Sequence, residues 1–160
     1  MNYIIREIES KDNLKIATVI RNVFEELDAP KAGTAYADPH LNTLFEVYQD
    51  DTEIYFVVEM NGTILGGCGI GNLVEAEFKI CELQKMYLAK AVRGKGIAKE
   101  LMQKCLTFAK QVGYDKCYIE TLPFMKDAQK LYVKSGFTYI DGPIGATGHN
   151  ACDVFMIKDL

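Results

Sequence analysis

The stretch AVRGKGIAKEL, residues 91–101, places two glycines and three cations directly before an apolar helical pattern. Gly94 and Gly96 allow a tight turn and a close approach of a ligand to the backbone, because neither carries a Cβ atom. The N-terminus of the following helix would supply unpaired N–H groups and a partial positive charge. Arg93 and Lys95 add full charges beside it. This combination is typical of a site that binds a diphosphate.

Two common phosphate-binding patterns do not fit these residues. In a Walker A loop a serine or threonine follows the lysine, whereas Gly96 follows Lys95 here and Ala89 stands in place of the first glycine. A Rossmann fingerprint would need a third glycine where Lys99 stands. The second glycine-rich stretch, residues 66–72, lies within a strand pattern, where glycines relieve crowding or permit a bulge. A nucleotide-dependent phosphotransferase is therefore disfavoured.

The first third of the chain predicts a strand, a helix, a loop and a shorter helix. The strand covers residues 3–8, and Ser10 is the expected N-cap of the helix that follows. Proline and glycine mark residues 28–40 as a loop, and the shorter helix is expected over residues 40–50. The apolar stripe of the first helix comprises Ile16, Ile20, Val23, Phe24 and Leu27.

The middle of the chain predicts a hairpin, a strand and a long helix. Asn61-Gly62 between two β-rich runs is the strongest short signal for a hairpin turn. Another strand is expected over residues 76–88, antiparallel to the one before it. The glycine stretch at residues 91–101 then opens a helix that Gly113 ends. The buried stripe of this helix comprises Ile97, Leu101, Cys105, Leu106 and Ala109.

The last third predicts a strand over residues 116–122 and a helix over residues 126–137 that Gly136 stops. An irregular loop is expected at residues 142–148 and a closing strand over residues 152–160. A strand, a helix and a strand in succession imply a parallel right-handed crossover. The chain therefore reads as one α/β domain (α+β, with a mixed sheet) over residues 1–160.

Composition narrows the class of partner. A net charge of −4 gives no electrostatic case for binding nucleic acid or an anionic membrane. No apolar run reaches the roughly 20 residues of a membrane helix, and no cationic leader suggests a signal peptide. The two histidines match no zinc spacing, so no metal site is expected. Free thiols in a reducing cytoplasm are the expected state of the cysteines, which are Cys68, Cys81, Cys105, Cys117 and Cys152.

The spacing R-x-x-G-x-A of Arg93, Gly96 and Ala98, between a strand and a helix, resembles the coenzyme A loop of the GNAT superfamily, the acyl-CoA-dependent N-acetyltransferases. Residues 128–137, AQKLYVKSGF, resemble the helix A-x-x-L-Y-x-x-x-G-F of the same family. The order of elements agrees over nearly the whole chain. Three stretches, GTAYADPHL, ETLPFMKDAQKLY and GATGHNACD, look like those of a compact bacterial subgroup. The resemblance implies a mostly antiparallel sheet with one splayed parallel strand pair, flanked by about four helices.

The resemblance also implies acetyl-CoA as cosubstrate and assigns the residues that bind it. Backbone groups of Met86 and Leu88 would pair with the pantetheine amides. Many relatives have an asparagine where Met125 stands, so this contact would differ here. The pyrophosphate would lie on Arg93, Gly94, Lys95, Gly96, Ile97 and Ala98.

Catalysis would take place in the cleft between the splayed strands. An N–H group near Leu88 would polarise the thioester carbonyl. Glu82 is the first candidate for the general base and Glu120 the second, and the alternative for each is a structural carboxylate. Tyr132 occupies the general-acid position of the family, although a buried helical tyrosine without this motif is usually only packing.

The loops would select the acceptor. Tyr36, Asp38 and His40 lie between the first two helices, and His149 lies before the last strand. Acidic residues would suit a cationic amine, and histidines a carboxylate; Asp38 as a helix cap is the plainer reading. The expected acceptor is the primary amine of a small molecule or amino acid. A protein amine as acceptor, a non-catalytic CoA-binding module, and a homodimer formed through sheet edges stay open.

Overall fold

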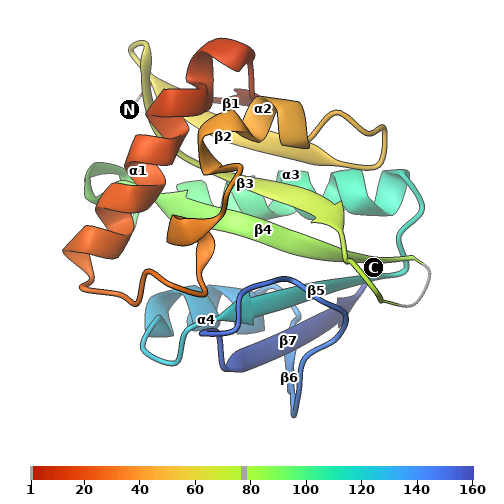
Figure 1. Cartoon of the computed structure of the whole chain (residues 1–160). Coiled ribbons are helices and arrows are strands. Elements are labelled where there is room, and N and C mark those ends of the chain that lie inside the picture. The colour runs from red at the N-terminus through yellow and green to blue at the C-terminus, as the bar shows by residue number, and fades with distance from the viewer. Residues whose placement is uncertain (1, 77–78) are drawn as a thin grey trace.

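The computed structural model describes residues 2–76 and 79–160 as one twisted sheet with helices on both faces (Figure 1). The α-helices of this part are α1 (Asn13–Glu26), α2 (Leu44–Val47), α3 (Ile97–Gln111) and α4 (Lys126–Lys134). The strands are β1 (Ile4–Glu7), β2 (Ile54–Met60), β3 (Thr63–Asn72), β4 (Ile80–Leu88), β5 (Lys116–Thr121), β6 (Thr138–Ile140) and β7 (Val154–Asp159).

The strands follow the order β1-β2-β3-β4-β5-β7-β6, and all neighbours pair antiparallel except β4 and β5. The connection from β4 through α3 to β5 is thus the parallel crossover that the sequence predicts, and the predicted fold class is confirmed. The strand predicted over residues 76–88 begins at Ile80; positions 77 and 78 of that prediction lie outside the described residues. The hairpin turn at Asn61-Gly62 is confirmed, with φ of 51° and 78°.

Two local predictions are corrected, and one strand was missed. Ser10 is not a helix cap: it lies inside a short 3₁₀ turn that Glu9 precedes, and the Glu9 N–H donates to Asp12 Oδ2 at 2.8 Å. Leu27 is 42% exposed, because α1 ends one residue earlier. β6 was not predicted, since three residues are too few for a period and only pairing with β7 makes them a strand.

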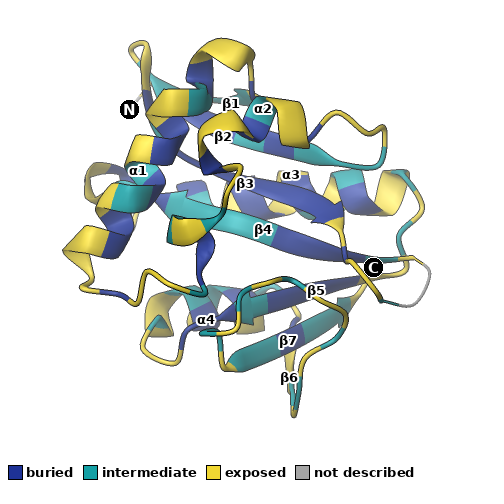
Figure 2. Ribbon diagram, viewed as in Figure 1, coloured by how far each residue is buried: buried dark blue, intermediate teal, exposed yellow. Residues whose placement is uncertain are grey.

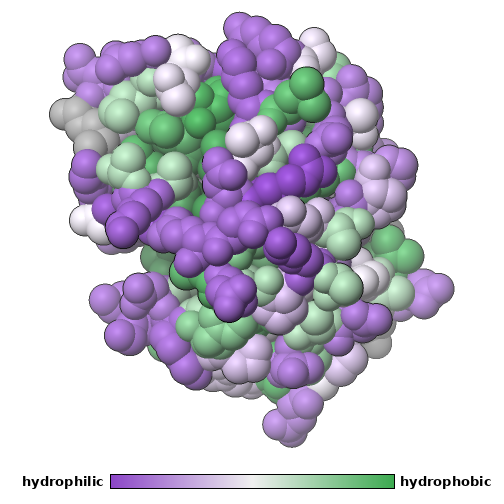
Figure 3. Space-filling view, turned by 60° about the vertical axis from the view of Figure 1, so that its left-hand side comes forward, coloured by the Kyte–Doolittle hydropathy of each residue, from purple (hydrophilic) through white to green (hydrophobic). Residues whose placement is uncertain are grey.

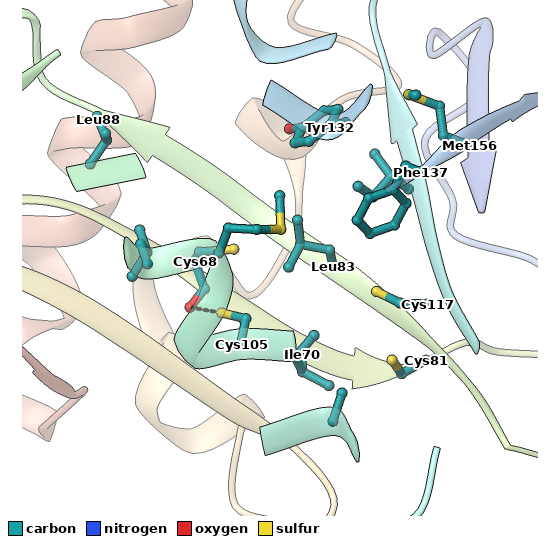
Figure 4. Packing of buried hydrophobic residues seen from close by; sticks show 14 of the residues in the cluster. Cys68, Ile70, Cys81, Leu83, Leu88, Cys105, Cys117, Tyr132, Phe137 and Met156 are labelled. Carbon is teal, nitrogen blue, oxygen red and sulfur yellow. Dashed lines mark hydrogen bonds between the residues drawn. The ribbon is translucent and has the colours of Figure 1, made fainter. Parts of the chain in front are cut away.

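Each face of the sheet carries its own apolar core (Figure 2). On one face, α1 and α2 cover a cluster that includes Phe24, Tyr55 and Leu44. On the other, α3 and α4 cover a cluster that includes Leu101 and Tyr132 (Figure 4). All five cysteines are free thiols as predicted, and four of them lie buried in this second cluster. Within the described residues, no helix is long and apolar enough to span a membrane.

The glycines of β3 are required by close packing rather than by an unusual backbone conformation. A methyl group built on Gly67 would lie 2.6 Å from the carbonyl oxygen of Phe56 and 2.9 Å from the hydroxyl of Tyr55. A methyl on Gly71 would strike the amide of Gln84. The crowding expected from the sequence is therefore confirmed, and β2 and β4 approach β3 closely on both sides.

Gly67→Ala is expected to lower the free energy of unfolding by about 1–3 kcal/mol, because the methyl group meets backbone that cannot move aside easily. Urea unfolding followed by circular dichroism measures the change. Gly142→Ala is the matched control, since a methyl there meets no atom within 4 Å. Equal midpoints for the two variants would contradict the packing argument.

Candidate active site

A cleft opens where the parallel pair separates. β4 and β5 pair only at Ile80–Lys116, Cys81–Cys117 and Glu82–Tyr118. Beyond that point the strands bound a cavity of about 650 Å³. Figure 3 turns this side forward, and the surface is hollowed between the upper half of the molecule and the lower half with α4 and β5. One wall is formed by residues 82–88 of β4 and another by residues 119–122, at the end of β5. Residues 124–128 and parts of α1, α3 and α4 complete the lining.

A bulge in β4 shapes one wall of this cavity. Gly67 of β3 pairs with Tyr87, but Gly69 pairs with Gln84, so β4 has one residue more than β3 in this interval. Lys85 lies in this interval and has a φ of 50°, in the left-handed region. The hydroxyl of Tyr55 donates to its carbonyl oxygen at 2.7 Å and holds the backbone in this conformation. The bulge bends β4 at the cleft and redirects the side chains that follow.

The glycine loop lies at the edge of the same cavity. Gly94 and Gly96 have φ of 72° and 80°, and a methyl group on either would meet no atom within 4 Å. Gly96 is the N-cap of α3, whose first N–H groups have no partner within the helix. Among the predicted loop residues, Lys95 and Ile97 are not part of the cavity wall, and Ile97 is fully buried in the core. The other four line the cavity: Arg93, Gly94, Gly96 and Ala98.

Arg93 connects the loop to two other elements. Its Nε donates to the carbonyl oxygen of Leu88 at 2.8 Å, and its terminal nitrogens donate to the two carboxylate oxygens of Glu26 at 2.9 and 3.1 Å. The guanidinium therefore ties the loop to the end of β4 and the end of α1. Direct contact between Arg93 and a diphosphate stays a prediction.

Glu82 is a buried carboxylate in the cavity wall, 6% exposed. The Gln84 amide donates to its Oε1 at 2.7 Å, and the Tyr48 hydroxyl donates to Gln84 Oε1 at 2.6 Å. Burial raises the pKa of Glu82 to about 7, although the Gln84 donor acts in the opposite direction. A pKa close to the working pH suits a general base, which must be ionised to accept a proton.

Glu120 lies across the cavity on β5, and both of its carboxylate oxygens already accept hydrogen bonds. The Tyr118 hydroxyl donates to its Oε1 at 2.8 Å, and the Thr147 hydroxyl donates to its Oε2. Glu82 Oε2, by contrast, accepts no hydrogen bond from the described residues. The geometry favours Glu82 over Glu120 as the group that is free to accept a proton.

Tyr132 of α4 reaches the cavity from the opposite face of the sheet. Its ring packs against Phe137 with 6.2 Å between centroids, and the hydroxyl points away from that ring (Figure 4). The side chain is 6% exposed and lines the cavity. Burial raises the pKa of Tyr132, so the phenol keeps its proton at neutral pH. A protonated donor and a carboxylate acceptor therefore flank one cavity.

Asp38, Lys85 and His149 form a polar cluster on the side of the cavity where Glu82 lies. Lys85 Nζ lies 2.8 Å from Asp38 Oδ2, and His149 Nε2 lies 2.8 Å from Asp38 Oδ1. Burial opposes ionisation of Asp38, but the contacts with His149 and Lys85 lower its pKa below the ordinary value. The Asp38 side chain is thus used in this cluster and does not cap a helix; Lys85 and His149 line the cavity.

Of the residues predicted to select the acceptor, Tyr36 and His40 lie elsewhere. The Tyr36 hydroxyl donates to Glu25 at 2.9 Å, and its ring packs edge-on against Phe24. His40 is exposed, and neither residue belongs to the cavity wall. Met86, Leu88 and Met125 do line the cavity, and their contact with coenzyme A stays a prediction.

Sequence reasoning missed Gln84, Tyr48 and Lys85. Gln84 could have been found, because residues two apart on a strand share a face and Glu82 was already a candidate. Tyr48 reaches the site from the loop after α2, and no local pattern points to it. Lys85 is re-aimed by the bulge. In the parts of the chain that the structure describes, no cluster of three or more His, Cys, Asp or Glu could hold a metal ion.

Comparison with known proteins identifies the family. The sequence model of the acetyltransferase (GNAT) family matches residues 20–137. An uncharacterised N-acetyltransferase of Escherichia coli K12, YjgM, is 45% identical over 159 residues, covering 98% of this chain and 95% of that protein. A GNAT acetyltransferase from Staphylococcus aureus Mu50 superposes with a TM-score of 0.82 at 20% identity, with 99% of both chains covered. The PaiA N-acetyltransferase of Thermoplasma acidophilum, solved with coenzyme A, gives 0.77 at 18% identity over both whole chains. The chain belongs to the GNAT acetyltransferase family.

Proposed function

We propose that this chain transfers an acetyl group from acetyl-CoA to the primary amine of a small molecule or amino acid, by direct attack in a ternary complex. The observation that carries the proposal is a single cavity between splayed strands, with a carboxylate of raised pKa on one side and a protonated phenol on the other. The whole of residues 1–160 is taken as one acetyltransferase domain.

The cavity suits the chemistry of coenzyme A. Gly94 and Gly96 leave open space beside the N-terminus of α3, where a diphosphate would accept N–H donors. Lys99, Lys126 and Lys134 also line the cavity and add positive charge. Beyond Glu82, β4 pairs only with β3 among the described residues, so an extended pantetheine arm could pair with its open edge near residues 86–88.

Glu82 would prepare the amine for attack. At pH 7 only about one alkylammonium in a thousand is neutral, so a base that removes the proton raises the reactive fraction. Glu82 Oε2 is free to accept that proton, directly or through water. The amine nitrogen then bonds to the acetyl carbon, and an N–H near Leu88 would stabilise the negative charge that develops on the carbonyl oxygen.

Tyr132 would complete the transfer. As the carbon–sulfur bond breaks, the thiolate of coenzyme A needs a proton, and the Tyr132 hydroxyl would donate it. The same apolar surroundings that raise the pKa of Tyr132 also raise the basicity of a thiolate placed beside it. Proton transfer from Glu82 to solvent and from solvent to Tyr132 would restore both groups.

Release of free thiol from acetyl-CoA, measured against a panel of amines, tests the proposal. Turnover that requires an added amine, with the acetylated amine identified by mass spectrometry, is the expected result. Coenzyme A binding measured by calorimetry without thiol release for any amine would contradict it and favour a non-catalytic CoA-binding module. Thiol release with peptides alone would assign a protein amine as the acceptor.

Gly96→Ala is expected to weaken coenzyme A binding by about 5- to 30-fold, because an alanine at a φ of 80° strains the loop that presents the helix N–H groups. Isothermal titration calorimetry measures the change. Gly113→Ala is the control: Gly113 has a φ of 101° and equally open surroundings, but it lies at the other end of α3. Equal losses of affinity in the two variants would sink the assignment of this loop.

A further inference from the structure

The Asp38–Lys85–His149 cluster joins three segments far apart in the sequence at the Glu82 side of the cavity. Asp38 comes from the loop after α1, Lys85 from the β4 bulge, and His149 from the loop before β7. The Ala151 N–H also donates to the Gly33 carbonyl at 3.1 Å, so the two loops dock on each other directly. These contacts hold the cluster in place beside the cavity.

The Asp38 carboxylate is already paired with other members of the cluster. One of its oxygens faces the Lys85 ammonium and the other faces His149, each at 2.8 Å. The Lys85 ammonium has three donors, and Asp38 is its ion-pair partner among the described residues. Its side chain is only 12% exposed and lines the cavity, so a ligand bound there would displace water from the donors that remain. A cavity-lining cation in this state is suited to an anionic group of a ligand.

Negatively charged groups lie near Lys85 in the wall of the same cavity. Glu82 is three residues before Lys85 on β4, and Glu120 faces it from β5. The Glu82 carboxylate suits an ammonium group, and Glu120 adds negative charge nearby, whereas the Lys85 ammonium suits a carboxylate. A ligand that carries both groups would match both parts of this wall at once.

We propose that the acceptor is an amino acid or a similar amine that carries a carboxylate, and that Lys85, supported by Asp38 and with His149 beside it, binds this carboxylate while the amino group lies at Glu82. The inference rests on the proposed acetyltransferase function and names the substrate class of that site. Asp38 is a positioning residue in this arrangement, since it orients Lys85 and His149 without contacting the acceptor.

Sets of matched amines test the inference. Each set contains an amino acid, its carboxamide and the amine that remains after decarboxylation, and the sets cover the protein amino acids and short ω-amino acids. The acid of the best set should exceed its carboxamide in kcat/KM by about 10- to 100-fold, the range expected for a charge-assisted contact. Lys85→Met should remove this preference by lowering kcat/KM for the acid far more than for its carboxamide, and Lys85→Arg should retain part of it.

Lys11→Met provides the matched control, because Lys11 pairs with Glu9 on the surface and lies outside the cavity wall. Turnover of carboxamides or simple amines at rates equal to those of the acids would overturn this inference and leave the acetyltransferase function standing. Equal loss of activity for acid and carboxamide in Lys85→Met, with Lys11→Met unaffected, would assign the cluster to loop structure alone and overturn it as well. An absence of thiol release with every amine would refute the proposed function, and this inference with it.

Discussion

Tyr132→Phe lowers kcat by about 10²-fold or more, if the phenol supplies the proton that the leaving thiolate needs. The ring would still fill its place against Phe137, so the loss measures the hydroxyl. That hydroxyl makes no hydrogen bond to the described residues, and removing it should leave the melting temperature nearly unchanged. Steady-state rates of thiol release, together with calorimetric affinity for coenzyme A, separate chemistry from binding.

Tyr114→Phe is the control for this experiment. The Tyr114 hydroxyl lies within hydrogen-bond distance of two acceptors, the Thr52 carbonyl oxygen at 3.2 Å and Asn72 Oδ1, and the residue lies outside the cavity wall. Its variant should keep nearly full kcat. A Tyr132→Phe enzyme within about threefold of the parent rate would refute the acid role, and the residue would then be a packing residue of the second core.

Glu82→Gln is expected to lower kcat/KM by about 10²- to 10⁴-fold and to change its dependence on pH. In the parent enzyme Glu82 must be ionised to accept a proton, so the rate should fall as the pH drops through about 7. Glutamine cannot ionise, so this acidic limb should disappear. It can still accept the Gln84 hydrogen bond, which preserves the local structure.

Glu120→Gln separates the two candidate bases. If Glu82 is the base, Glu120→Gln keeps an acidic limb, which moves to lower pH because the charge of Glu120 contributes to the raised pKa of Glu82. Loss of the limb in Glu120→Gln with an unchanged limb in Glu82→Gln would transfer the role to Glu120. An unchanged limb in both variants would eliminate both carboxylates as the base.

The raised pKa of Glu82 also predicts a change in stability that needs no substrate. The folded protein binds the proton more tightly than the unfolded chain, whose glutamate has a pKa near 4.5. Stability contributed by this group is therefore fully present at low pH and is lost as the pH rises to about 7. Relative to Glu82→Gln, the parent should lose up to about 3 kcal/mol of unfolding free energy across this window. A constant difference between the two proteins would show that Glu82 is not desolvated.

Local signals determined most of the fold. The periodicities predicted α1, α3 and α4, and Asn61-Gly62 predicted the hairpin, because a left-handed turn needs residues that tolerate positive φ. The strand–helix–strand order predicted the parallel pair. The Ser10 cap was wrong because several polar residues compete for a helix start, and the choice depends on how the turn packs.

The residues of the candidate site were predicted from the sequence, but their contacts were not. Gly94 and Gly96 were visible in the sequence as a short pattern before a helix, whereas Glu82 and Tyr132 were candidates because the chain resembles the GNAT superfamily. The contacts that their neighbours make around β4 were not visible. Tyr48, Asp38 and His149 reach β4 from distant loops, and the bulge at Lys85 arises from how β3 and β4 pair.

The sequence alone therefore determined the candidate site residues and the elements that carry them, because hydrophobic period and turn chemistry act over a few residues. Only the tertiary structure decided the pKa of Glu82, the engagement of Glu120 and the cluster around Asp38. Burial and charge pairing depend on which distant segments meet at the splayed strands, and no local pattern encodes that meeting.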